Sequence, residues 1–347
     1  MAFRIRHEVL ELTTTHAFNI ARASAPPVRR SVWVRIEDGS GVEGWGEAAA
    51  NAYYGETAET VVALLPRYEQ ALNDSAGENA DVLALERAES AVERAAGRNP
   101  AARAAVSAAL HDLAGRRLGI PVWQLWGLDA AMPVSSFTIG MDEPAAMLQR
   151  LEEAASFPVI KVKVGSPADR HVLEQIRKRA PDRTIRIDAN TGWSVKQAVA
   201  LLPVLEDLGI ELIEQPFKAD DIDSFRVLRE RSAIPVIADE SCRIAADIPR
   251  LVGAVDGINI KLEKCGSMRE AVRMVHIARA HHLQVMVGCM LCTTLGIAAA
   301  MQIAPLVDWT DLDGAMLLRA DPFRGPSLSR NGSLSLNAEP GLGVTLR

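Results

Sequence analysis

Val159-Ile160-Lys161-Val162-Lys163-Val164 is a short apolar segment that carries two lysines, and it decides the fold of this chain. Side chains alternate along a β-strand, so Lys161 and Lys163 share one face, opposite Val162. Burying a charge is costly, so two lysines in an apolar strand need a reason. Apolar segments with a charged residue at the end recur along the chain, in steps of 25, 26, 25 and 22 residues from Lys163. The charged residues reached by these steps are Asp188, Glu214, Asp239 and Lys261.

Each of these steps has the length of one strand plus one helix. Such a rhythm is typical of parallel strands joined by helices, and eight units favour a closed barrel over an open sheet. The barrel should occupy residues 126–319 and gather the charged groups at the carboxyl ends of its strands, where active sites lie in this fold. The eight predicted strands are 134–139, 159–164, 184–188, 211–214, 236–239, 257–261, 284–287 and 309–313.

The first third of the chain has a different pattern, typical of an α+β domain over residues 1–125. Strands are predicted at 3–12, 30–37 and 42–47, with a hairpin turn at Asp38-Gly39-Ser40-Gly41. Helices are predicted at 57–72, 81–96 and 99–118, the last with Asn99 as its N-cap and Pro100 in its first turn. Residues 320–347 are loop-rich, with a strand near Val344, and should return to complete this first domain.

Composition excludes several classes of protein. The 347 residues are 48% hydrophobic and 24% charged, with a net charge of −6, which does not provide the basic surface that nucleic acid requires. Arg29-Arg30 and Arg116-Arg117 are short pairs and read as solvated faces. The N-terminus lacks a signal sequence and no apolar run is long enough to cross a bilayer, so we expect a cytoplasmic protein without a membrane partner. The four cysteines, Cys242, Cys265, Cys289 and Cys292, are expected to be packed thiols, because no second C-x-x-C completes a zinc site.

Three carboxylates end successive strands: Asp188, Glu214 and Asp239. A set of oxygen donors without histidine or cysteine suits a hard cation, so we predict one Mg²⁺ per subunit. The alternative, three separate carboxylates that cap helices, would not explain why they recur at one height with lysines on either side.

Lys163 and Lys261 belong to strands that face each other across the barrel mouth. A substrate carboxylate on the metal would have an amine on each side of its α-carbon. Removal of the α-proton makes an ene-diolate, which a divalent cation stabilises. A lysine base needs a pKa near neutrality. Lys161 either pairs with a metal-site carboxylate or lowers the pKa of Lys163.

Taken together, these motifs resemble the muconate-lactonizing branch of the enolase superfamily. The matching motifs are K-x-K at Lys161, D-A-N at Asp188, E-Q-P at Glu214, D-E-S at Asp239 and I-K at Lys261. The resemblance implies a modified (β/α)7β TIM-type barrel with an N-terminal α+β capping domain, completed by about residues 320–347. It also implies that Lys163 and Lys261 are the bases, supported by Lys161, Asn190 and Glu240.

The residues at the end of the seventh predicted strand distinguish the muconate-lactonizing branch from the mandelate racemase branch. The mandelate racemase branch would place a histidine base at the end of this strand. Here His281 and His282 lie at its beginning, and its end reads Val287-Gly288-Cys289.

Asp311 and Asp313 resemble the D-x-D pair with which dipeptide epimerases hold the substrate ammonium, and alternation would put both on one face. The segment from Phe18 to Arg22 resembles the loop of L-Ala-D/L-Glu epimerases whose arginine pairs with the glutamate side chain. Tyr54 lies in the second specificity loop, although Ala48-Ala49-Ala50 departs from the proline that is common before it. Phe18 could equally be a core residue. The resemblance places Thr138 in the substrate site as well.

We therefore expect a Mg²⁺-dependent dipeptide epimerase, acting on L-Ala-D/L-Glu of murein peptide metabolism, in a homo-oligomer. Other reactions of the branch remain as alternatives: N-acylamino acid racemase, o-succinylbenzoate synthase and muconate cycloisomerase. An epimerase for a non-acidic dipeptide is another alternative. A binding protein that has lost catalysis is the alternative from another class, and the retained carboxylates and lysines argue against it.

Overall fold

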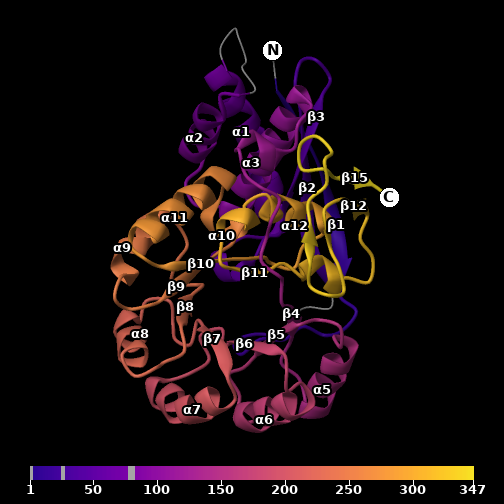
Figure 1. Cartoon of the computed structure of the whole chain (residues 1–347). Helices are drawn as coiled ribbons and strands as arrows, with labels where there is room; N and C mark the ends of the chain where they lie inside the picture. The colour runs from indigo at the N-terminus through magenta and orange to yellow at the C-terminus, as the bar shows by residue number, and fades with distance from the viewer. Residues whose placement is uncertain (1–2, 25–27, 77–82) are drawn as a thin grey trace.

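The computed structural model describes residues 3–24, 28–76 and 83–347, and it shows a barrel with a second layer of sheet and helices above it (Figure 1). Within these residues, no helix combines the length and the apolar character needed to span a membrane. The first third of the chain forms the upper layer and residues 137–311 form the barrel.

The upper layer is built on a three-stranded antiparallel sheet of β1 (Arg4–Thr13), β2 (Val28–Glu37) and β3 (Glu43–Ala48). The predicted hairpin turn joins β2 to β3, and the Asp38 carboxylate accepts the Ser40 amide at 2.8 Å. Val32, Val34 and other even-numbered residues of β2 pack in a core with the helices of this layer, whereas Trp33 belongs to the core of the barrel. Alternation along β2 therefore gives the sheet one face toward its own helices and one toward the barrel.

Three helices cover that sheet: α1 (Ala58–Ala76), α2 (Leu85–Ala95) and α3 (Pro100–Leu118). Residues 81 and 82 of the predicted second helix lie outside the described residues. The predicted Asn99 cap is wrong, because Asn99 has a φ of 52° and its side chain makes no capping hydrogen bond. Glu56 replaces it: its carboxylate accepts the amides of Ala101 and Ala102 at 3.0 and 3.2 Å. Two short helices, η1 (Ala52–Tyr54) and α4 (Val122–Leu125), were not predicted.

The barrel sheet has eight parallel strands in sequential order. A bridge between Ser135 and Thr310 joins its first strand region to its last, so the predicted TIM-type barrel is confirmed. The strands are β4 (Phe137–Ile139), β5 (Val159–Lys163), β6 (Thr184–Asp188), β7 (Ile210–Glu214), β8 (Val236–Ala238), β9 (Gly257–Ile260), β10 (Gln284–Gly288) and β11 (Trp309–Asp311).

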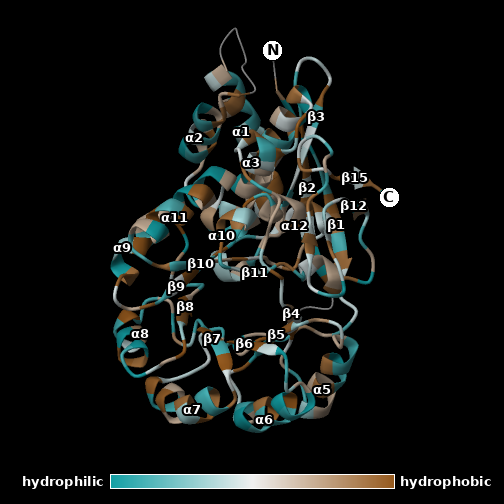
Figure 2. Ribbon diagram, viewed as in Figure 1, coloured by the Kyte–Doolittle hydropathy of each residue, from teal (hydrophilic) through white to brown (hydrophobic). Residues whose placement is uncertain are grey.

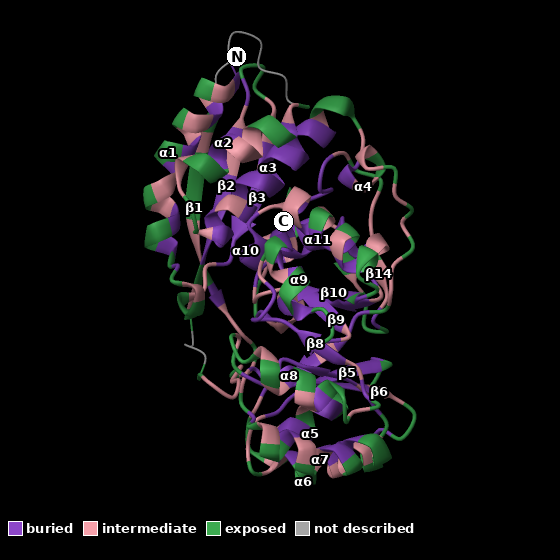
Figure 3. Ribbon diagram, turned by 90° about the vertical axis from the view of Figure 1, so that its left-hand side faces the viewer, coloured by how far each residue is buried: buried purple, intermediate pink, exposed green. Residues whose placement is uncertain are grey.

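Helices follow the first seven barrel strands, which is the (β/α)7β pattern. They are α5 (Pro144–Glu153), α6 (Asp169–Arg179), α7 (Val195–Asp207), α8 (Ile222–Arg229), η2 (Ala245–Asp247) with α9 (Ile248–Leu251), α10 (Leu262–Cys265) with α11 (Met268–Ala280), and α12 (Thr294–Met301) with η3 (Ala304–Leu306). Figure 2 shows polar colours on these helices. Figure 3 shows buried strands between partly exposed helices.

Strand register explains the recurring charges. In the parallel ladder Lys163 lies beside Asp188, and Asp188 lies beside Glu214. Asp239 and Lys261 each follow the last residue of their strands, β8 and β9. The sequence spacing therefore predicted a common height correctly, because parallel strands run in one direction and their carboxyl ends lie at the same edge of the barrel.

The C-terminal segment begins with η4 (Gly314–Leu317) and continues as β12 (Phe323–Arg324), β13 (Ser327–Leu328), β14 (Leu334–Ser335) and β15 (Thr345–Leu346). It contacts the first domain. The ring of Phe323 packs edge-on against Trp33 at 5.1 Å, and the Leu342 amide donates to the buried Asp112 carboxylate at 2.7 Å. The domain boundaries near residues 125 and 320 stay predictions.

Candidate active site

The three carboxylates predicted to bind metal lie together. Asp188, Glu214 and Asp239 are buried, and each offers an oxygen within 4.8 Å of the others. Burial and the charge of Asp188 raise the pKa of Glu214 to about 7. Burial opposes ionisation of Asp188 too, but the ammonium groups of Lys163 and Lys161 hold the pKa of Asp188 below its ordinary value. Three hard oxygen donors that repel one another fit a divalent cation such as Mg²⁺.

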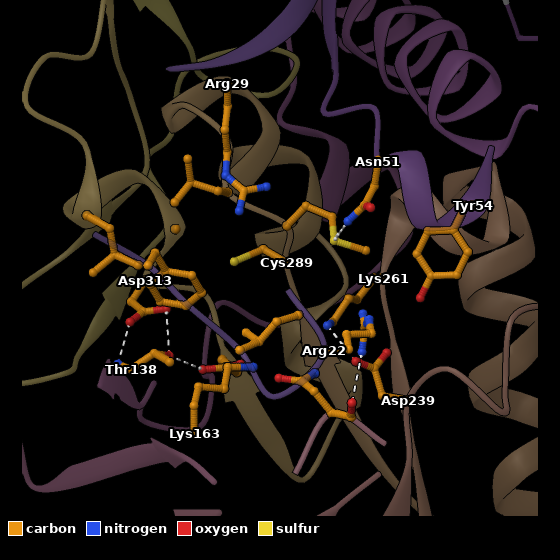
Figure 4. Close-up of a pocket in the computed structure, with 18 residues that line it drawn as sticks. Arg22, Arg29, Asn51, Tyr54, Thr138, Lys163, Asp239, Lys261, Cys289 and Asp313 are labelled. Atoms are coloured by element: carbon orange, nitrogen blue, oxygen red, sulfur yellow. Dashed lines mark hydrogen bonds and ion pairs between the residues drawn. The ribbon is translucent and has the colours of Figure 1, made fainter. Parts of the chain in front are cut away.

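Two lysines flank this cluster. The Lys163 ammonium donates to Asp188 Oδ2 at 2.6 Å, and the Lys261 ammonium donates to Asp239 Oδ2 at 2.7 Å. They come from β5 and from the residue after β9, and both line one cavity of about 100 Å³. Figure 4 shows Lys163 and Lys261 entering this cavity from different sides. A group held at the carboxylates would therefore have an ammonium on each side.

Lys161 lies deeper and takes no part in lining the cavity. Its ammonium contacts Glu214 at 2.6 Å, Asp311 at 2.7 Å and Asp188 at 3.2 Å. Burial would lower the pKa of Lys161, but these carboxylates, Asp311 foremost, hold it well above its usual value. Of the two roles predicted for Lys161, the structure shows the ion pair with metal-site carboxylates.

Asp311 and Asp313 also line the cavity. Figure 4 shows Asp313 on the side away from Asp239. Strand β11 ends at Asp311, two residues earlier than predicted, so Asp313 lies in the following loop. Thr138 holds the pair together: its hydroxyl lies 3.2 Å from both carboxylates and its amide donates to Asp313 at 2.6 Å. Burial and the charge of Asp311 raise the pKa of Asp313 to about 7. This pair is suited to a cationic group of a ligand.

The loop from the first domain reaches the cavity, as predicted. Phe18, Arg22 and Tyr54 line it, so Phe18 is not a plain core residue. The loop approaches the barrel closely: a Cβ built on Gly165 or Gly192 would lie 2.5 or 2.6 Å from the Ala21 Cβ, so only glycine fits at these two positions.

Arg22 has partners within the protein. It forms an ion pair with Glu240, donates to the Asn190 carbonyl at 3.2 Å and stacks over the Tyr53 ring at 4.2 Å. The Asn190 side chain also donates to Glu240, at 3.4 Å. Glu240 and Asn190, both predicted as supporting residues, therefore hold Arg22 at the cavity wall.

Comparisons with known proteins match this geometry over both parts of the chain. Residues 143–347 match the family described as Enolase C-terminal domain-like. Residues 5–127 match the N-terminal domain of the mandelate racemase / muconate lactonizing enzyme family. The chain belongs to the enolase superfamily.

Several similar proteins within the superfamily are dipeptide epimerases. The L-Ala-D/L-Glu epimerase of Bacteroides thetaiotaomicron is 41% identical over 96% of this chain and 85% of its own length. A substrate-liganded L-Ala-D/L-Glu epimerase from Bacillus subtilis is 30% identical, with a TM-score of 0.93 and 99% of each chain covered. A dipeptide epimerase from Enterococcus faecalis, complexed with Mg and L-Leu-L-Tyr, is 32% identical, with a TM-score of 0.93, over 99% of this chain and all of that one.

Two buried residues that were not predicted as site residues, Gln215 and Lys264, contact Asp239 of the carboxylate cluster. Gln215 accepts the Asp239 amide at 2.8 Å through its side chain, and so ties the loop after β7 to the loop after β8. The Lys264 ammonium contacts Asp239 Oδ1 at 2.5 Å and donates to the Asn259 carbonyl at 2.8 Å. Their nearness in sequence to Glu214 and Lys261 was a signal, but their partners lie on other strands.

Two arginines predicted to be solvated have other surroundings. Arg116 donates to the buried Asp112 carboxylate at 2.9 Å, and Arg29 lines the active-site cavity. The four cysteines are free thiols, and Cys289 lines the cavity while Cys292 is buried.

Proposed function

We propose that this chain is a Mg²⁺-dependent dipeptide epimerase that transfers a proton at the α-carbon beside the C-terminal carboxylate of a dipeptide. The observation that carries the proposal is the position of Lys163 and Lys261, which line one small cavity and donate to two different carboxylates of the cluster, Asp188 and Asp239. The second support is Asp311 and Asp313 in the same cavity, where they can bind the ammonium of the dipeptide.

Asp188, Glu214 and Asp239 would hold the metal. Mg²⁺ bound there would supply the positive charge that stabilises the negative charge developing on the substrate carboxylate during proton removal. Lys163 and Lys261 would exchange roles in the two directions: one takes the α-proton as a neutral amine, and the other, as an ammonium, delivers a proton to the opposite side. Epimerisation needs both, because inversion requires removal and return from different faces.

The two aspartates distinguish a dipeptide from other substrates of the branch. Asp311 is ionised and paired with Lys161, and Asp313 faces the cavity with a hydrogen bond from Thr138. N-acylated amino acids and dicarboxylates present no ammonium to satisfy these carboxylates. We infer that L-Ala-D/L-Glu is the substrate, on the support of the 41% identical relative with that name.

A dipeptide library incubated with Mg²⁺ in D₂O tests the proposal. Mass spectrometry should detect one deuterium at the α-carbon of the C-terminal residue, and chiral chromatography should detect both epimers. Lys163→Ala serves as the matched control, because it keeps the metal-binding carboxylates and removes one base. If N-acetylated amino acids exchange faster than every free dipeptide, the reaction is that of an N-acylamino acid racemase instead.

A further inference from the structure

Arg29 lies on the barrel-facing side of β2. Trp33, another odd-numbered residue of β2, packs in the barrel core. The adjacent Arg30 projects to the other face and forms an ion pair with Glu59 of α1. Alternation thus sends two consecutive arginines in opposite directions. Figure 4 shows the Arg29 guanidinium pointing into the active-site cavity from the side across from Lys163 and Asp239.

Arg29 is an uncompensated cation. Among the described residues it has no ion pair or hydrogen bond, and its Nε is buried without an acceptor. A guanidinium stays protonated, so an unpaired one at a partly buried site is costly unless a ligand pairs with it. Burial lowers the pKa of Arg29, in agreement with this cost. Arg22 differs, because Glu240 already neutralises it.

The surroundings of Arg29 leave room for a substrate side chain. Arg29 lines both the catalytic cavity and a second cavity of about 570 Å³ beneath the first domain. The two cavities share further walls, including Phe18, Asn51 and Met290. A side chain that leaves the α-carbon between the lysines toward the larger cavity would pass the guanidinium.

We propose that Arg29 is the specificity-determining residue that binds an acidic side chain of the dipeptide. A planar guanidinium can form two parallel hydrogen bonds with one carboxylate, which a neutral side chain cannot match. Arg22, in this assignment, positions Glu240 and the loop. The inference rests on the proposed dipeptide epimerase function and names the residue that would select an acidic dipeptide.

The test compares Arg29→Met with Arg30→Met, the same substitution at the neighbouring residue. Each variant and the native enzyme are assayed on L-Ala-L-Glu, on the neutral isostere L-Ala-L-Gln and on L-Ala-L-Leu. Arg29→Met should lower kcat/KM for L-Ala-L-Glu by about 10- to 100-fold, as expected for loss of a half-buried charge pair. It should change the other two substrates by no more than about threefold. Arg30→Met should leave all three unchanged, because an exposed ion pair contributes little.

Two results would overturn the assignment. One is an equal loss on all three dipeptides in Arg29→Met. The other is a selective loss on L-Ala-L-Glu in Arg22→Met while Arg29→Met keeps its selectivity, which would make Arg22 the binding residue. Calorimetric binding of L-Ala-L-Glu and L-Ala-L-Gln with Mg²⁺ separates the two proposals. If no dipeptide is epimerised, the proposed function fails. Tighter binding of L-Ala-L-Glu than of L-Ala-L-Gln that disappears in Arg29→Met would still support this binding site. If the native protein binds both dipeptides equally, the assignment of Arg29 is refuted.

Discussion

Replacing Asp313 by asparagine should separate substrate binding from metal binding. Asp313 is buried, and it accepts the Thr138 amide at one carboxylate oxygen and the Thr138 hydroxyl at the other. In the variant the asparagine oxygen can accept the amide, while its NH₂ group donates to the Thr138 hydroxyl, which can still donate to Asp311. What is lost is the negative charge that faces the substrate ammonium. A hydrogen bond to a charged group contributes about 1.5–3 kcal/mol. The corresponding loss in kcat/KM is about 10- to 150-fold for free dipeptides, with the affinity for Mg²⁺ unchanged.

The same substitution should not destabilise the protein. The pKa of Asp313 is raised to about 7 from its ordinary 3.8, so the folded protein binds more protons than the unfolded chain between these values. Stability of the native enzyme therefore falls as the pH rises from about 4 to about 7. Asparagine does not ionise, so the melting temperature of Asp313→Asn relative to the native enzyme should increase over this range.

Steady-state kinetics on L-Ala-L-Glu, and differential scanning calorimetry without ligand at pH 5 and pH 8, measure both effects. N-acetyl-L-Ala-L-Glu is the control substrate, because it lacks the ammonium and should be converted poorly by both proteins. The reasoning is refuted if Asp313→Asn melts lower than the native enzyme at pH 8. It is also refuted if the free and N-acetylated dipeptides lose activity in the same proportion.

Three further predictions test the metal, the bases and the fold. Excess EDTA should abolish epimerisation and added Mg²⁺ should restore it; undiminished turnover in EDTA would exclude the metal site. Glu214→Gln should lower kcat by at least about 100-fold and weaken Mg²⁺ binding measured by calorimetry. Lys163→Ala and Lys261→Ala should both stop epimerisation, while each still exchanges deuterium into one epimer only, as followed by NMR; racemised product from either variant would contradict a two-base reaction. Glu56→Ala should reduce the free energy of unfolding by about 1–2 kcal/mol in urea titrations, because α3 loses its N-terminal acceptor, whereas an unchanged midpoint would show that water replaces it.

The parts of the site that the sequence could predict depend on repetition. Lys163, Asp188 and Glu214 end neighbouring parallel strands, so counting residues from one strand to the next was enough to place them together. Strand β11 ends two residues earlier than predicted, but the loop still keeps Asp313 beside Thr138.

The parts that the sequence could not predict depend on contacts between distant elements. The cap of α3 comes from Glu56 rather than from Asn99, because the left-handed backbone at Asn99 removes its side chain from the helix end. Arg29 and Arg30 were both predicted to be solvated, but Arg29 faces the cavity. Which of the two faces it depends on how β2 packs on the barrel. Spacing along one chain contains no information about such docking.

The return of the C-terminal segment to the first domain has a consequence for how the protein is made. On the ribosome the first domain is synthesised before the barrel, whereas Phe323, which packs on Trp33, and Leu342, whose amide donates to Asp112, are synthesised after it. A nascent chain that ends before residue 323 would leave Trp33 without one of its two aromatic neighbours and Asp112 without one of its two backbone donors. The first domain therefore cannot reach its final packing until the barrel has been synthesised, although it precedes the barrel in the chain.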